Sequence, residues 1–108
     1  MEFSNYQKAA RTTAIYGDGN KVVYPALGLA SEAGEVAGKV KKVLRDRGGT
    51  FGPETIEAIR DELGDVLWYV AVLAADLGLS LDDIAARNVE KLRSRMARGT
   101  IQGNGDRR

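Results

Sequence analysis

The chain has 108 residues, the length of one domain, and 44% of them are apolar, enough for one ordinary core. Its 16 basic and 15 acidic residues leave a net charge of +1, which argues against a general nucleic-acid binder with a strongly basic face. The chain contains no cysteine and no histidine, so disulfides, thiolate or imidazole metal sites, cysteine nucleophiles and Ser-His-Asp triads are excluded. Any catalysis must therefore use carboxylates, amines, guanidinium groups, hydroxyls or a metal ion.

Four segments carry apolar residues at helical spacing, and none alternates with period two for long enough to predict a strand. Ser4 and Ser80 are the expected N-caps of the first and last helices, and Pro25 suits the first turn of the second. The first, third and fourth predicted helices span about residues 4–16, 53–77 and 80–96, and the second runs from about Pro25 toward a loop that begins at Gly48. We therefore predict an all-α domain over residues 1–98 and a flexible, glycine- and arginine-containing tail over residues 99–108.

Residues 66–75 form the longest apolar run, and they are apolar on every side of the predicted third helix. The run is too short to cross a bilayer, which takes about 20 residues, and residues 1–5 do not have the pattern of a secretion signal. We expect a soluble intracellular protein. The second face of this helix, carrying Trp68 and Val72, is expected to be buried against another subunit, most simply in an isologous dimer. The alternative is the central helix of one compact bundle.

The second and third helices share a motif, apolar-x-x-Glu-x-Gly-acid-Val, over residues 29–36 and 59–66. The two acids of each copy lie on adjacent turns of one helix face, at the edge of the apolar stripe. If the helices pack antiparallel through their stripes, four carboxylates converge. These acids are Glu32, Glu35, Glu62 and Asp65.

Four converging carboxylates repel one another unless a cation neutralises them, and magnesium or manganese is the oxygen-preferring choice. A di-iron site is disfavoured, because such bundles use Glu-x-x-His motifs. Gly34 and Gly64 each cost a helix about 1 kcal/mol relative to alanine, which suggests close approach of a backbone or ligand. The alternative is an ordinary solvated acidic face without a ligand, but the duplicated motif favours a metal site.

Basic and amide side chains follow the acids on the second and fourth helices. Asn88 lies beside an apolar stripe, where a half-buried amide needs a ligand or another partner. Together the cations are typical of polyphosphate binding, although each one singly is explained by ion pairing or solvation. The candidate phosphate-binding residues are Lys39, Lys42, Asn88, Lys91, Arg95 and Arg98. No P-loop or dinucleotide-binding glycine motif accompanies them.

Residues 28–35, 61–69 and 88–92 resemble the all-α nucleotide pyrophosphohydrolases, the superfamily that includes MazG and the dimeric dUTPases and dCTPases. The resemblance covers roughly residues 25–96, and its E-x-x-E plus E-x-x-D pair is quite specific. Larger members often begin the first motif with two glutamates, and Ser31 stands in the first of those places. The chain is therefore similar to the compact, single-domain type. The fold implied is a four-helix-bundle-like MazG-type domain that oligomerises through its helices.

The resemblance implies magnesium-dependent hydrolysis of a (deoxy)nucleoside triphosphate to the monophosphate and pyrophosphate, in a cytoplasmic homodimer or homotetramer (the host cytoplasm for a phage-encoded member). It assigns the four acids to the metal, with manganese as a possible substitute. The mechanism that fits has Glu35 take the proton of the attacking water, while Lys39 and the polar residues of the fourth helix hold the phosphates. Neither a nucleic acid nor a membrane is expected as a partner. The alternatives are a non-catalytic dimerising adaptor and a hydrolase of nucleoside diphosphates or an alarmone.

Overall fold

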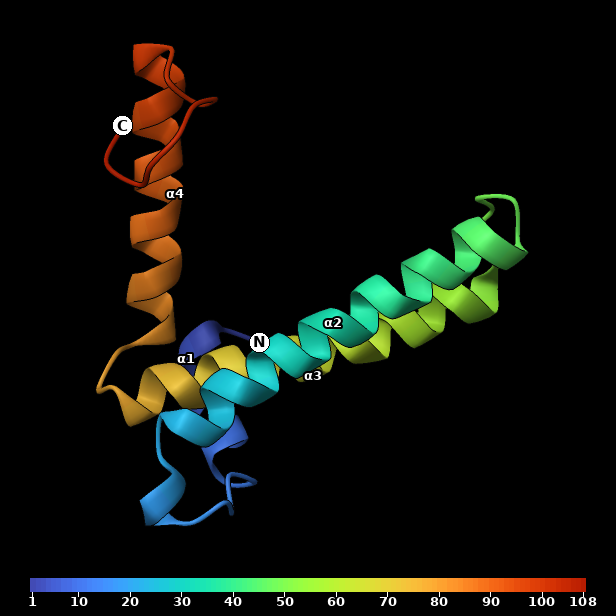
Figure 1. The fold of residues 1–108 in the computed structure, drawn as a ribbon. Coiled ribbons are helices and arrows are strands. Elements are labelled where there is room, and N and C mark those ends of the chain that lie inside the picture. The colour runs from blue at the N-terminus through green and yellow to red at the C-terminus, as the bar shows by residue number, and fades with distance from the viewer.

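The computed structural model describes residues 1–108 as four α-helices and one short 3₁₀ turn, with no strand (Figure 1). The all-α prediction is confirmed. The helices are α1 (Phe3–Arg11), α2 (Val23–Asp46), α3 (Pro53–Asp76) and α4 (Leu81–Arg98), and the 3₁₀ turn is Asp18–Asn20.

The predicted helix ends differ most at α1, which stops at Arg11 instead of continuing to Tyr16. The hydroxyls of Thr12 and Thr13 donate to the carbonyls of Ala9 and Ala10, so these side chains occupy acceptors in the last turn of the helix. The prediction of Ser4 as N-cap was wrong, because the helix begins at Phe3 and Glu2 is in the N-cap position.

The start of α4 follows its prediction. The Ser80 hydroxyl accepts the Asp83 N–H at 3.3 Å and caps the helix.

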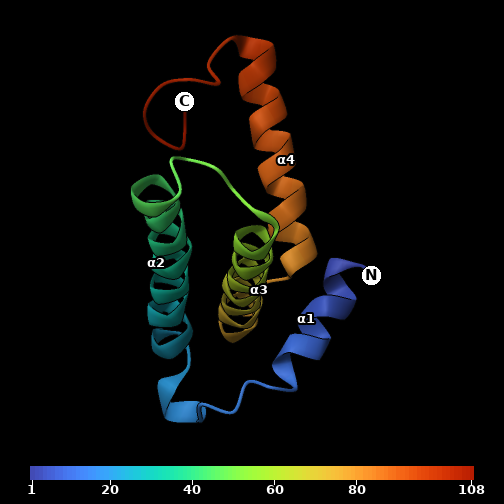
Figure 2. The ribbon, with the colours of Figure 1, turned by 90° about the vertical axis from the view of Figure 1, so that its right-hand side faces the viewer.

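Helices α2 and α3 form a long antiparallel hairpin, in which the two arms lie side by side along most of their length (Figure 1). Seen end-on, α3 lies between α2 and α1 (Figure 2). The loop at residues 47–52 joins the arms, and the buried Val43 packs near that end of α2. This hairpin brings the two acidic motifs opposite each other.

The second face of α3 is covered by α1 of the same chain, which corrects the expectation that a partner subunit buries Val72. Val72 is 1% exposed and belongs to a small core with Ala10, Ala71 and Leu81. The Trp68 indole N–H donates to the Thr13 hydroxyl at 2.8 Å, so that side chain also has its polar partner within the chain. Residues 12–22 connect α1 to α2, and this connection is long enough for α1 to pack against α3.

Helix α4 leaves the rest of the chain after a bend of 106° from α3 and extends away from the hairpin (Figure 1). The radius of gyration is 16.7 Å, whereas a compact domain of this length has about 13 Å. Only 8 of the 108 residues are buried. Leu63 on α3 and Met96 on α4 are 54% and 66% exposed, so one chain leaves much of its apolar surface uncovered.

No single helix of the chain is long and apolar enough to cross a membrane. Helices α3 and α4 reach that length and composition only when they are taken together, across the bend between them.

Candidate functional site

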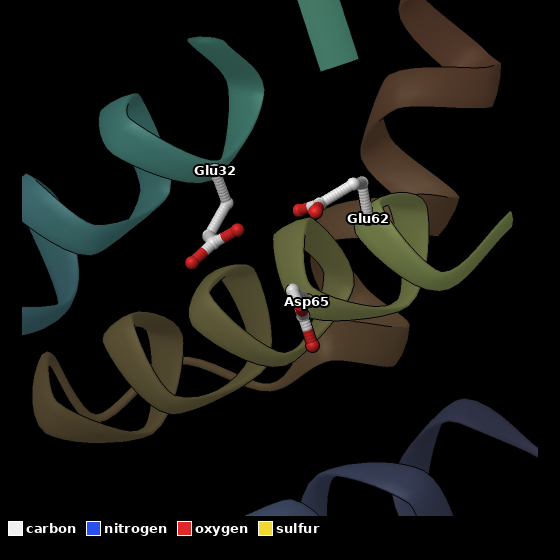
Figure 3. Close-up of side chains that lie close together, drawn as sticks. All are labelled: Glu32, Glu62 and Asp65. Carbon is white, nitrogen blue, oxygen red and sulfur yellow. The ribbon is translucent and has the colours of Figure 1, made fainter. Parts of the chain in front are cut away.

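Three acids converge where the two motifs face each other across the hairpin (Figure 3). Glu32 reaches from α2 toward α3, and Glu62 and Asp65 lie one turn apart on α3. One carboxylate oxygen of each residue lies within 4.8 Å of those of the other two. The antiparallel packing expected from the sequence thus brings three of the four predicted ligands together.

The electrostatics of this cluster favour a cation. Hydrogen bonding with Glu62, then burial and the negative charges of Glu62, Asp65 and Glu35, raise the pKa of Glu32. The Oε2 atom of Glu62 is buried and has no hydrogen-bond partner. Lys39 Nζ lies 3.6 Å from Glu62 Oε1 and supplies one positive charge. An orphaned carboxylate oxygen among three clustered acids fits a hard divalent cation, which prefers oxygen ligands.

Glu35, the fourth predicted ligand, lies outside this three-acid cluster and is exposed. Its charge still reaches Glu32, one turn earlier on α2. Gly34 and Gly64 were expected to allow close approach of a backbone, but the space where each Cβ would stand is open in this chain. The surface beside the acids is therefore free for a ligand or for another chain.

Lys39 and Lys42 line a cleft of about 320 Å³ between the hairpin arms, toward the loop that joins them. Arg47 adds a third cation to its wall, and Asp46 and Glu54 add two acids. Lys39 lines this cleft and also pairs with Glu62, so its side chain lies between the cleft and the acidic cluster. Of the predicted phosphate-binding residues, the structure thus places Lys39 next to the acids and Lys42 in the same cleft as Lys39.

The other predicted phosphate-binding residues lie on α4, which extends away from the hairpin (Figure 1). None of them forms a salt bridge or hydrogen bond with the acidic cluster in this chain. Asn88 is exposed, contrary to the half-buried position expected for it, and shares a shallow hollow with Lys91. Lys91 and Arg95 pair with Asp106 of the C-terminal tail. Arg98 donates to the Ser94 hydroxyl at 3.0 Å.

Tyr69 is a residue of this region that the sequence reasoning missed. Its ring packs against Gly28, where a Cβ atom would overlap the ring, and it stands edge-on to Trp68 with ring centres 5.0 Å apart. Hydrogen bonding with Tyr24, burial and the nearby acids Glu32 and Asp65 raise the pKa of Tyr69. The available signal was its position four residues after Asp65, on the same helix face.

Comparison with known proteins agrees with this geometry. The family model for the MazG nucleotide pyrophosphohydrolase domain matches residues 25–99, a stretch that holds the whole acidic cluster. The chain is also 48% identical, over 114 aligned positions covering both proteins completely, to the Gene 37 protein of Mycobacterium phage L5. No solved structure matches the chain. The chain belongs to the MazG nucleotide pyrophosphohydrolase family.

Proposed function

We propose that this protein hydrolyses a (deoxy)nucleoside triphosphate to the monophosphate and pyrophosphate, with magnesium as its cofactor. The observation that carries the proposal is the convergence of Glu32, Glu62 and Asp65 in a chain of this family, with Glu62 Oε2 buried and unpaired. A merely solvated acidic face leaves no such atom away from water.

Glu32, Glu62 and Asp65 are the residues that would hold the metal, and Glu35, one turn after Glu32 on α2, is the proposed fourth ligand. Bound there, Mg²⁺ or Mn²⁺ supplies charge neutralisation for the phosphates and a lowered pKa for water. A cation held there would offset the negative charges that raise the pKa of Glu32.

In the proposed reaction, the oxygen of water forms a bond to the α-phosphorus while the bond from that phosphorus to the α–β bridging oxygen breaks. The exposed carboxylate of Glu35 accepts the proton of the water. Lys39 and Lys42 hold the β- and γ-phosphates in the adjoining cleft and stabilise the negative charge of the departing pyrophosphate.

We propose that the working site also uses α4 of a second copy of the chain. An extended chain with little buried core, together with exposed apolar residues on α3 and α4, supports self-association into a dimer or tetramer. A partner copy would bring Asn88, Lys91 and Arg95 toward the acids that they do not reach within one chain. Sedimentation analysis tests this part, because a mass equal to one 11.7 kDa chain at micromolar concentration would contradict it.

The activity is tested by measuring pyrophosphate release from a panel of NTPs and dNTPs with magnesium. Glu62→Gln and Glu35→Gln remove a proposed ligand and the proposed base. Glu57→Gln is the matched control, since Glu57 is an exposed residue of α3 outside the cluster. We expect release by the wild type and by Glu57→Gln, and losses of about 10²- to 10⁴-fold for Glu35→Gln.

The products distinguish this reaction from hydrolysis of a nucleoside diphosphate, which releases orthophosphate and no pyrophosphate. Absence of release from every nucleotide, together with identical melting of wild type and Glu62→Gln with metal, would favour the adaptor. In that case the acidic cluster has no catalytic role. The cytoplasm (the host cytoplasm, for a phage protein) is the compartment that we propose, since nucleoside triphosphates and magnesium are found there.

A further inference from the structure

The C-terminal tail folds back along α4 and closes on itself. Helix α4 ends at Gly99, whose φ of 71° lies in the left-handed region, and the Thr100 N–H then donates to the Arg95 carbonyl at 2.8 Å. Arg108 donates to the carbonyls of Thr100 and Ile101, each at 3.1 Å, and also to that of Gly105. Residues 100–108, which we call the C-terminal strap, are therefore held as a loop by their own last residue.

Asp106 of the strap lies on two of the cations that the proposed function assigns to substrate phosphates. Its Oδ1 atom is 2.8 Å from Lys91 Nζ and 3.2 Å from Arg95 Nη2, and its backbone carbonyl accepts a further hydrogen bond from Arg95. Arg95 is 4% exposed and is the only buried charged residue of the chain. The strap thus engages the one charged side chain of the chain that is buried.

The chemistry of this contact resembles that of a bound phosphate. An anionic oxygen shared by a lysine and an arginine, with a second oxygen on the same guanidinium, is an arrangement in which such cations hold oxyanions. The two cations lower the pKa of Asp106, which keeps the carboxylate charged at neutral pH. Asp106 itself is 81% exposed, so a ligand entering from solvent can displace it without opening a core.

We propose that the C-terminal strap is an intramolecular competitor for the anion site formed by Lys91 and Arg95, with the Asp106 carboxylate in the position of a phosphate. The inference rests on the proposed function for the identity of the natural ligand, a nucleotide polyphosphate. Binding of that ligand displaces Asp106 and releases the strap from α4. The apparent affinity of the site is reduced by the fraction of molecules in which the strap is closed.

The probe is inorganic pyrophosphate without divalent metal, so that neither turnover nor the acidic cluster is needed. Its affinity is measured by calorimetry for the wild type, for Asp106→Asn and for the control Glu90→Gln. Glu90 is an exposed acid of α4, next to Lys91 in sequence, and forms no salt bridge. Its substitution removes an equal negative charge, from a residue next to Lys91 in sequence, without changing the strap. We expect Asp106→Asn to bind pyrophosphate about three- to tenfold more tightly than the wild type, and Glu90→Gln to remain within about twofold.

The second readout is the backbone amide NMR spectrum of residues 100–108. In the wild type, saturating pyrophosphate should move these signals toward their positions in ligand-free Asp106→Asn. Three outcomes would each overturn the proposal. The wild type and Asp106→Asn could bind pyrophosphate with equal affinity, Asp106→Asn and Glu90→Gln could gain equally in affinity, or the strap signals could stay in place when pyrophosphate binds. Failure of the proposed function gives a different result from failure of the strap proposal. In that case no nucleotide is hydrolysed, but pyrophosphate still releases the strap.

Discussion

The carboxylates of Glu32 on α2 and Glu62 on α3 lie side by side, within 4.8 Å, at the centre of the hairpin. Hydrogen bonding with Glu62, burial and the nearby negative charges raise the pKa of Glu32. Lys39 is the one cation that pairs with either of them in the chain. The cluster therefore holds more negative charge than its own neighbours neutralise, and this imbalance underlies the first prediction.

Magnesium or manganese should stabilise the folded protein, because the cation binds the folded cluster and not the unfolded chain. At a metal concentration of one hundred times Kd, the gain is about 2.7 kcal/mol. The measurement is the melting temperature with and without metal. Glu62→Gln should lose most of the gain, whereas Glu57→Gln, on the exposed side of α3, should keep it. A gain of equal size in both variants would show that the metal binds elsewhere.

Lys39→Met should lower kcat for pyrophosphate release by about 10- to 10³-fold, because it removes the cation between the acids and the cleft. The matched substitution is Lys41→Met, which removes the same charge from an exposed position of α2 that forms no salt bridge. This control should change kcat less than about twofold. Steady-state kinetics on the preferred nucleotide test the pair, and similar losses in both would indicate a general effect of charge.

Alanine at Gly28 and at Gly34 should have opposite effects on stability. A Cβ at Gly28 overlaps the ring of Tyr69, which Trp68 and Tyr24 hold in place, so Gly28→Ala should cost about 1–3 kcal/mol. A Cβ at Gly34 meets nothing in the chain, so Gly34→Ala should gain up to about 1 kcal/mol from helix propensity. Urea unfolding measures both. Destabilisation by Gly34→Ala would indicate that another chain packs against that position.

Tyr16 should give the folded state a pH dependence in the alkaline range. Its hydroxyl donates to Asp76 at 2.7 Å, and burial together with this bond raises its pKa from 10.0 to about 12. Because the folded-state pKa is the higher one, this contribution to stability is complete below pH 10 and is lost as the pH rises toward 12. Denaturant unfolding across that pH range measures the loss, and Tyr16→Phe should remove this part of it. A pH dependence that is unchanged in Tyr16→Phe would assign the effect to other groups.

Asp76 also anchors the loop before α2, and this contact was not foreseeable from the sequence. Besides the Tyr16 hydroxyl it accepts the N–H of Val22 at 2.9 Å, a residue whose φ of 66° is unfavourable for a β-branched side chain. Nothing in residues 17–22 indicates a partner 54 positions away. The loop conformation depends on where α3 ends relative to α1, and that is a property of the packed chain.

The sequence by itself determined the helices and the pairing of the acidic motifs. Helical hydrogen bonds join residues four apart, so the position of a helix is encoded locally. The signals are the period of the apolar residues, the positions of the glycines and the cap at Ser80. Glu32 and Glu62 meet because a short loop obliges α2 and α3 to pack antiparallel, which places the two motifs opposite each other. Local spacing plus one tight connection was sufficient for the core of the candidate site.

Only the tertiary structure decided which surfaces the flanking segments cover. Val72 is buried by α1 and not left for a partner, and Lys91 and Arg95 are joined to Asp106 instead of to the acids. Both outcomes depend on the direction of the chain through residues 12–22 and on the bend between α3 and α4. The spacing of residues within a helix does not encode these directions. Contacts between distant segments form when the whole chain minimises its exposed apolar surface and unpaired charge, so they become visible only in the folded molecule.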